Sequence, residues 1–209
     1  MISIKDVVQT IVSNDIEAQN SISRGILNLS QYAREIQEKV EEATKKEVSM
    51  QSIVVTLSRL ERKQKAYGFL PNVEISSLSV KSPIIELVYE KNQKNLEHVL
   101  KIFSTFQKDN DTFFSLSTST RDIAIVASVS LEKEIVKAVT QKPKFIKRDL
   151  SAVSVRFNES LVEQPNVGYA LMHLISLRNI TLDEVFSTYN EFTLVFKTED
   201  LHKVLEALK

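Results

Sequence analysis

Two stretches of the chain share one pattern: STSTRDIAIV at 117–126 and FSTYNEFTLV at 186–195, 69 residues further on. Each contains a Ser-Thr pair, then a polar turn, then the alternation of apolar and polar residues that is typical of a strand. Around both stretches the indicated order of elements is strand, helix, strand, strand, helix. A repeat of this length with two helices per copy predicts two copies of one α+β unit rather than a solenoid.

The number of strands available to each copy is the next constraint. A ferredoxin-like (βαββαβ) unit needs a fourth strand, and KFIKRDL at 144–150 is the candidate for the first copy. The second copy has no candidate after its last helix, which would leave a sheet edge open. An additional extended stretch at 73–80 precedes the first copy. We predict that this stretch completes the second copy, so that the two units interlock and the second does not fold alone.

The first 70 residues have a different pattern, because their apolar residues recur at helical spacing. Gly68 and Pro71 follow these predicted helices and mark a domain boundary. The predicted fold class is therefore α+β, a helical domain followed by two interlocked ferredoxin-like units. The expected domains are 1–70, 71–149 and 150–209.

The composition excludes several kinds of site. There is no cysteine, so disulfides, thiolate metal sites and cysteine nucleophiles are ruled out, and a cytoplasmic location is expected. The 27 basic and 27 acidic residues balance, so net charge predicts neither a polyanion nor a membrane partner. The sequence begins without a signal-peptide pattern, and its apolar runs are too short to span a bilayer.

Motifs of catalysis are also missing. The three histidines, His98, His173 and His202, lie far apart and lack metal-binding or catalytic neighbours. The sequence contains no phosphate-binding loop, nucleophile elbow or dinucleotide-binding fingerprint. We therefore expect no catalytic residue, no metal and no cofactor, in a protein that is not an enzyme.

Roughly the last 60 residues, the size of one small unit, resemble the C-terminal ACT regulatory domains of aspartate kinases; the likeness is weaker over 83–140. In that family two ACT units interlock through a strand that precedes the first, which agrees with the strand count above. No stretch before Pro71 is long enough for the kinase domain, so the resemblance implies only the sensing part. The matching positions are Pro165-Asn166-Val167, Asn179-Ile180, Ser187-Thr188, Glu191 and Glu199-Asp200.

The resemblance implies a ligand site between the first strand and first helix of a unit, where ACT domains bind amino acids, often across an interface between units. A helix N-terminus offers unpaired N–H groups and partial positive charge to a carboxylate. Asn166 stands where the family has glycine, so a plain helix start with a proline near its first position is the alternative. The candidate residues are Gln164, Pro165, Asn166, Val167, Gly168, Asn179 and Ile180.

Two of these positions have further alternatives. Asn179 is expected to begin the second strand next to the ligand loop, or else to cap the C-terminus of the preceding helix. The corresponding loop of the first copy, at 90–95, is charged and has neither glycine nor proline. We expect it to be solvated; the alternative is that Asn92 or Asn95 serves as a polar partner for a ligand.

The N-terminal helices resemble a helix-turn-helix region, with a supporting helix at 30–36 and a groove-reading helix at 49–63. Residues 1–66 contain ten Lys/Arg and nine Asp/Glu, a net charge of +1, whereas DNA-binding modules are usually clearly basic. The alternative is a helical bundle or dimerisation domain whose cationic end suits its own helix dipole. The candidate base-reading residues are Gln51 and Ser52, and the candidate phosphate-binding residues are Arg59, Arg62 and Lys63.

Together these patterns predict a non-enzymatic regulatory protein that senses a small molecule, an amino acid, through tandem ACT units and pairs as a homodimer. One alternative is an amino-acid-responsive transcription regulator that binds DNA through its N-terminal helices. Another is a structural or dimerisation subunit whose ACT units bind no ligand. A membrane partner is not expected.

Overall fold

The computed structural model describes residues 3–64, 70–106 and 112–209. The chain divides into two compact units, with the division after Asn72, except that Pro165–Ala170 are grouped with the first unit. Each unit has a hydrophobic core of its own. Of the two expected boundary residues, Pro71 lies just before the division and Gly68 lies outside the described residues.

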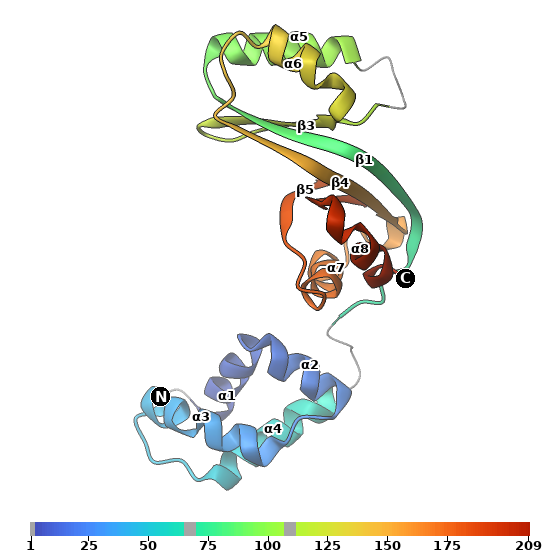
Figure 1. Cartoon of the computed structure of the whole chain (residues 1–209). Helices are drawn as coiled ribbons and strands as arrows, with labels where there is room; N and C mark the ends of the chain where they lie inside the picture. The colour runs from blue at the N-terminus through green and yellow to red at the C-terminus, as the bar shows by residue number, and fades with distance from the viewer. Residues whose placement is uncertain (1–2, 65–69, 107–111) are drawn as a thin grey trace. The chain divides into compact units, whose positions relative to one another are not determined.

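The N-terminal unit is built from helices, drawn in blue to cyan in Figure 1. The Asp15 carboxylate accepts a hydrogen bond from the Ala18 N–H and begins the second helix, and Gly25, at φ 68°, ends it. Buried aliphatic residues from all four described helices form one core. These helices are α1 (Ile4–Ser13), α2 (Ile16–Arg24), α3 (Leu29–Thr44) and α4 (Met50–Gln64).

The C-terminal unit is a six-stranded antiparallel sheet with the strand order β2-β3-β1-β4-β6-β5. Its strands are β1 (Ile75–Glu90), β2 (Phe114–Thr118), β3 (Asp122–Ser128), β4 (Phe145–Phe157), β5 (Leu182–Thr188) and β6 (Glu191–Lys197). Its helices are α5 (Gln93–Phe106), α6 (Glu132–Ala138), α7 (Val167–Ser176) and α8 (Leu201–Ala207), with 3-10 turns at Val129–Leu131, Glu159–Leu161 and Thr198–Asp200. The predicted α+β class is confirmed.

Strands β1 and β4 each take part in both repeats, which makes the repeats interlock. The first part of β1, from Ile75 to Lys81, pairs with the end of β4, which in turn pairs with β6. The last part of β1 lies between β3 and the start of β4. The sequence indicated two separate segments here, but β1 runs continuously, because Pro83 falls where the β1–β4 register shifts, between Lys81 and Ile84.

The two repeats have separate cores. Helices α5 and α6 cover the first-repeat end of the sheet, and α7 and α8 cover the second-repeat end (Figure 1). A further buried apolar cluster contains Ile84 and Val126 from the first repeat and Val195 from the second. The long strands curve between the two ends (Figure 1), and Asp149 there has a left-handed backbone, φ 59°. The curvature allows side chains of both repeats to meet.

Candidate functional site

The predicted ligand loop leads directly into α7. Gln164, Pro165 and Asn166 are exposed, so the Asn166 side chain is not buried within the loop. Asn166 has φ 69°, the left-handed conformation that glycine adopts freely and asparagine tolerates better than most residues. Its carbonyl accepts a hydrogen bond from the Ala170 N–H at 2.8 Å, the first of the helix. Asn166 therefore adopts the left-handed backbone conformation that a glycine would readily adopt at this position.

Asn179 does not lie next to this loop. It follows the C-terminus of α7 with φ 54°, and its N–H donates to the Ser176 carbonyl at 3.0 Å. The ten residues of α7 span about 15 Å, so Asn166 and Asn179 lie at opposite ends of the helix. Ile180 is buried in the core beneath α7. Asn179 is therefore a residue at the C-terminus of a helix, which was the alternative expectation for it. Within a single chain, the seven candidate ligand-binding residues do not meet in one site.

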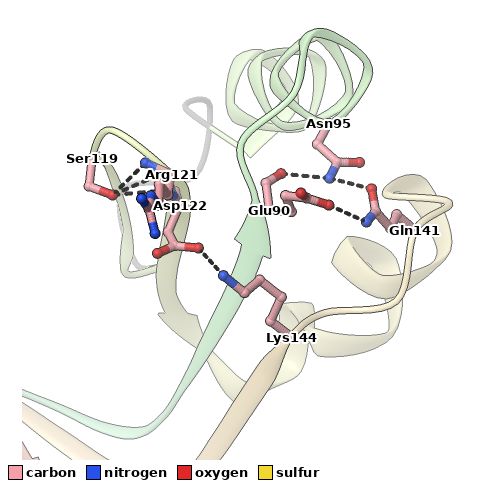
Figure 2. A network of polar contacts seen from close by, with 7 residues as sticks. All are labelled: Glu90, Asn95, Ser119, Arg121, Asp122, Gln141 and Lys144. Atoms are coloured by element: carbon pink, nitrogen blue, oxygen red, sulfur yellow. Dashed lines mark hydrogen bonds and ion pairs between the residues drawn. The ribbon is translucent and has the colours of Figure 1, made fainter.

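The corresponding loop of the first repeat is held by a buried asparagine (Figure 2). Asn95 is fully buried, and its Nδ2 donates both to the Glu90 carbonyl and to Gln141 Oε1, at 2.8 Å each. Gln141 also accepts from Asn92 Nδ2 at 3.0 Å and donates to Glu90 Oε2 at 3.3 Å. The expectation of a solvated loop is wrong for Asn95, because a side chain 46 residues away supplies its partner.

The same loop is tied to the turn between β2 and β3. Lys91 Nζ donates to the Ser119 carbonyl at 2.8 Å, and Ser119 Oγ accepts from the N–H of Asp122 at 3.0 Å. Lys144, which precedes β4, forms an ion pair of 2.5 Å with Asp122 (Figure 2). Asn95 Oδ1 is buried and has no hydrogen-bond partner in the structure. A buried acceptor without a partner is costly.

Comparisons with known proteins add a fold relationship. No protein-family model matches the sequence, and a search of curated proteins gave no match. The regulatory subunit of aspartate kinase from Thermus thermophilus, in its ligand-free form, matches with a TM-score of 0.51 and 10% identity, over 64% of this chain and 95% of that chain. The matched share of this chain is close to the share of the chain that the sheet unit makes up. The sheet unit has the fold of an aspartate kinase regulatory subunit.

Two further structures share this ACT fold. The α and β subunits of an aspartokinase give a TM-score of 0.52 and 6% identity, over 65% of this chain and 96% of that chain. The aspartate kinase of Clostridium acetobutylicum gives 0.54 and 12%, over 68% of this chain. This chain spans 36% of the length of that kinase. The ACT resemblance noted in the sequence is thereby confirmed as a resemblance of fold.

Outside the ACT units, the five predicted nucleic-acid-binding residues all lie along α4. Gln51, Ser52 and Arg59 line a hollow of about 650 Å³ beside the N-terminus of α1. Arg59, Arg62 and Lys63 line an adjoining hollow of about 450 Å³. Lys5 of α1 lines both hollows. No motif in the sequence marked Lys5, because only the packing of α1 against α4 brings it there.

The charged side chains that line these two hollows are all basic. Their charged lining residues are Lys5, Lys46, Arg59, Arg62 and Lys63, and none of the described acidic side chains lines either hollow. In the described part of the chain, all of these except Lys46 lack an ion-pair partner. The near-zero net charge of the N-terminal unit therefore conceals a local concentration of unpaired cations, which attracts anions.

The connection between α3 and α4 differs from the expected helix-turn-helix. The predicted supporting helix at 30–36 is the first half of a longer helix, since α3 continues to Thr44. Lys45, at φ 55°, ends α3, and α4 begins at Met50. Most of the chain between the two helix-turn-helix segments is thus helical.

Two other kinds of site are not found in the residues that the structure describes. No group of three or more His, Asp or Glu side chains there is placed to hold a metal ion. Across the same residues, every helix is too short or too polar to cross a lipid bilayer.

Proposed function

We propose that this chain is a non-enzymatic regulatory protein whose ACT units, at 71–149 and 150–209, bind an amino acid. The observation that supports the proposal best is the fold of the sheet unit, which is shared with regulatory subunits that lack a catalytic domain. The loops before α5 and α7 occupy equivalent positions in the two repeats. One loop contains a buried acceptor without a partner, and the other presents an exposed helix start.

In the second ACT unit, the carboxylate of the ligand is proposed to bind at the first turn of α7. The first N–H groups of a helix lack intrahelical partners, and the helix dipole adds partial positive charge. Asn166 is exposed at the start of this turn, and Gly168 has no side chain to obstruct a close approach. Asn179 and Ile180, at the other end of α7, are proposed to contact a ligand only if a second copy of the chain contributes them.

Titration calorimetry of the full chain with the twenty amino acids at millimolar concentration tests this site. We expect heat from at least one amino acid, and we expect Asn166→Asp to weaken its binding by roughly tenfold, since a second negative charge opposes the ligand carboxylate. Asn28→Asp is the matched control, because it places the same charge at the exposed start of α3, outside the ACT units, and should leave the affinity unchanged. Absence of heat from all twenty would contradict sensing.

The same protein is proposed to form a homodimer through its ACT units. Strands β2 and β5 are the two edges of the sheet, and unpaired edge strands favour association with another chain. Light scattering gives the oligomeric state. A dimer that binds none of the twenty amino acids would support the alternative of a structural subunit whose ACT units have no ligand.

A second proposed function is DNA binding by the N-terminal unit, in an amino-acid-responsive transcription regulator. What supports it is the row of unpaired cations between α1 and α4, with Gln51 and Ser52 beside it. Lysine and arginine neutralise phosphates, and amide and hydroxyl groups read base edges. Lys5 joins the predicted residues as a phosphate contact.

Fluorescence anisotropy with duplex DNA, measured between 50 and 200 mM salt, tests the second function. Replacing Arg59, Arg62 and Lys63 with alanine should weaken binding and lower the salt slope by about 3, at about 1 per lost phosphate contact. The control replaces three exposed lysines of the sheet unit, Lys94, Lys101 and Lys137, and should leave the slope unchanged. Equal slopes for the two triple variants would show that α4 is not the DNA-binding element.

A further inference from the structure

The two repeats meet through charged side chains as well as apolar ones. In the sheet, β4 and β6 lie between β1 and β5. Nevertheless Lys147 of β4 forms an ion pair with Asp183 of β5, and Glu86 of β1 interacts electrostatically with Glu184 and Asp183 of β5. Glu86 and Lys147 are also cross-strand partners in the β1–β4 pairing. These four residues, which we call the carboxylate cluster, link the first repeat to the edge strand of the second.

Two carboxyl groups of the carboxylate cluster are largely shielded from water, whereas Glu184 and Lys147 are partly exposed. Glu86 is only 7% exposed, and the Asp183 side chain only 9%. The neighbouring apolar cluster, with Ile84 and Val126, continues on the same side of β1 and receives Phe186 from β5. The surface between the repeats thus consists of an apolar part and a charged part, and β5 contributes to both.

The charges of the cluster do not balance. Three carboxyl groups share one ammonium group, that of Lys147, and Asp183 Oδ2 is buried with no hydrogen-bond partner among the described residues. The other lysines that line the hollow beside Asp183, Lys197 and Lys203, pair with Glu199 and Asp200 instead. Full ionisation would place the charge of the buried Glu86 beside two further carboxylates, which favours uptake of a proton by Glu86.

We propose that the carboxylate cluster is a proton-dependent latch between the two ACT units. With one proton on Glu86, β5 packs against β1 and β4; when that proton is lost, repulsion among Glu86, Asp183 and Glu184 loosens the contact. The bond that breaks is the O–H bond of the Glu86 carboxyl group, and the proton goes to solvent. The proposal does not depend on whether the ACT units bind an amino acid.

The direction of the pH effect follows from the surroundings of Glu86. Burial first, then Glu184 and Asp183, raise the pKa of Glu86 from 4.5 to about 7, while Lys147 acts in the opposite direction. The residue facing it on β3 is the apolar Val126, which contributes no charge. An open state binds the proton less tightly than the closed state, so the closed contact is stable at low pH and weakens as pH rises from 4.5 through 7.

Amide hydrogen exchange of the full chain tests the latch, with intrinsic exchange rates corrected for pH. Protection of β5, at 182–188, should fall on the order of tenfold between pH 5.5 and 8 in the wild type. Glu86→Gln keeps the shape and removes the titration, so its β5 protection should not change with pH. Glu134→Gln, on the exposed side of α6, should behave as the wild type does. A pH-independent wild type, or a pH dependence that survives Glu86→Gln, would overturn the proposal.

Carbon-13 NMR of the Glu86 carboxyl group provides a second measurement, which can be made on the wild-type protein. A midpoint near 7 is expected, and a midpoint near 4.5 would refute the latch. Lys147→Met removes the only cation of the cluster and should move the midpoint upward. If the midpoint stays in place, Lys147 does not act on Glu86, and the cluster as described is wrong.

Discussion

A chain that begins at Pro83 is expected to lose the structure of the second repeat, whereas a chain that begins at Val73 should keep it. The segment that differs contains six residues paired with β4, from Ile75 to Lys81. At about 1 kcal/mol net per ladder hydrogen bond, their loss removes several kcal/mol, comparable with the stability of a small domain. Ile75 also leaves the core beneath α7 and α8.

Amide exchange measured strand by strand distinguishes this result from general instability. The residues of β4 that face the missing segment, at 152–157, should lose protection most, since they become an open edge. The pairing of β1 with β3 at 84–90 is intact in both chains and serves as the internal control. Equal protection of 152–157 in the two chains would show that the segment is dispensable to the second repeat.

Phe196→Ala is expected to destabilise the sheet unit by about 3–5 kcal/mol, the usual cost of removing a large aromatic side chain from a core. Phe196 lies on β6, is fully buried, and packs with Val153, Leu171 and Val204. The cavity left behind cannot collapse easily, because a strand and two helices fix its walls.

Phe145→Ala is the matched control, since Phe145 also lies on a strand but is 50% exposed. It should cost about 1 kcal/mol or less, in proportion to the smaller apolar area that it buries. Urea unfolding followed by circular dichroism gives both values. Similar losses for the two variants would contradict the assignment of Phe196 to the core.

Much of the local structure could be predicted from sequence. Asp15 begins a helix and Gly25 ends it, as a capping carboxylate and a left-handed glycine usually do. The 69-residue repeat and the missing strand were visible because alternation and helical periodicity act over a few residues at a time. The continuity of β1 was missed, since Pro83 normally interrupts a strand and only the β1–β4 register accommodates it.

The candidate sites were less predictable. The loop residues Asn92 and Asn95 were noticed, but their partner Gln141 was not, because nothing near residue 141 marks it as a partner. Of the two expectations for Asn179, the helix C-terminal residue is the one that the structure has, because the order of residues in the chain does not determine which of them meet in space. Lys5 joined the cations of α4 only through the packing of two helices.

By itself, the sequence determined the elements of this protein, their order, and the presence of two α+β repeats that need each other's strands. Only the tertiary structure decided that Asn95 is buried and that Glu86 meets Asp183 and Glu184. The reason is physical: capping and periodicity are properties of neighbouring residues, whereas burial and charge environment depend on segments that are distant along the chain.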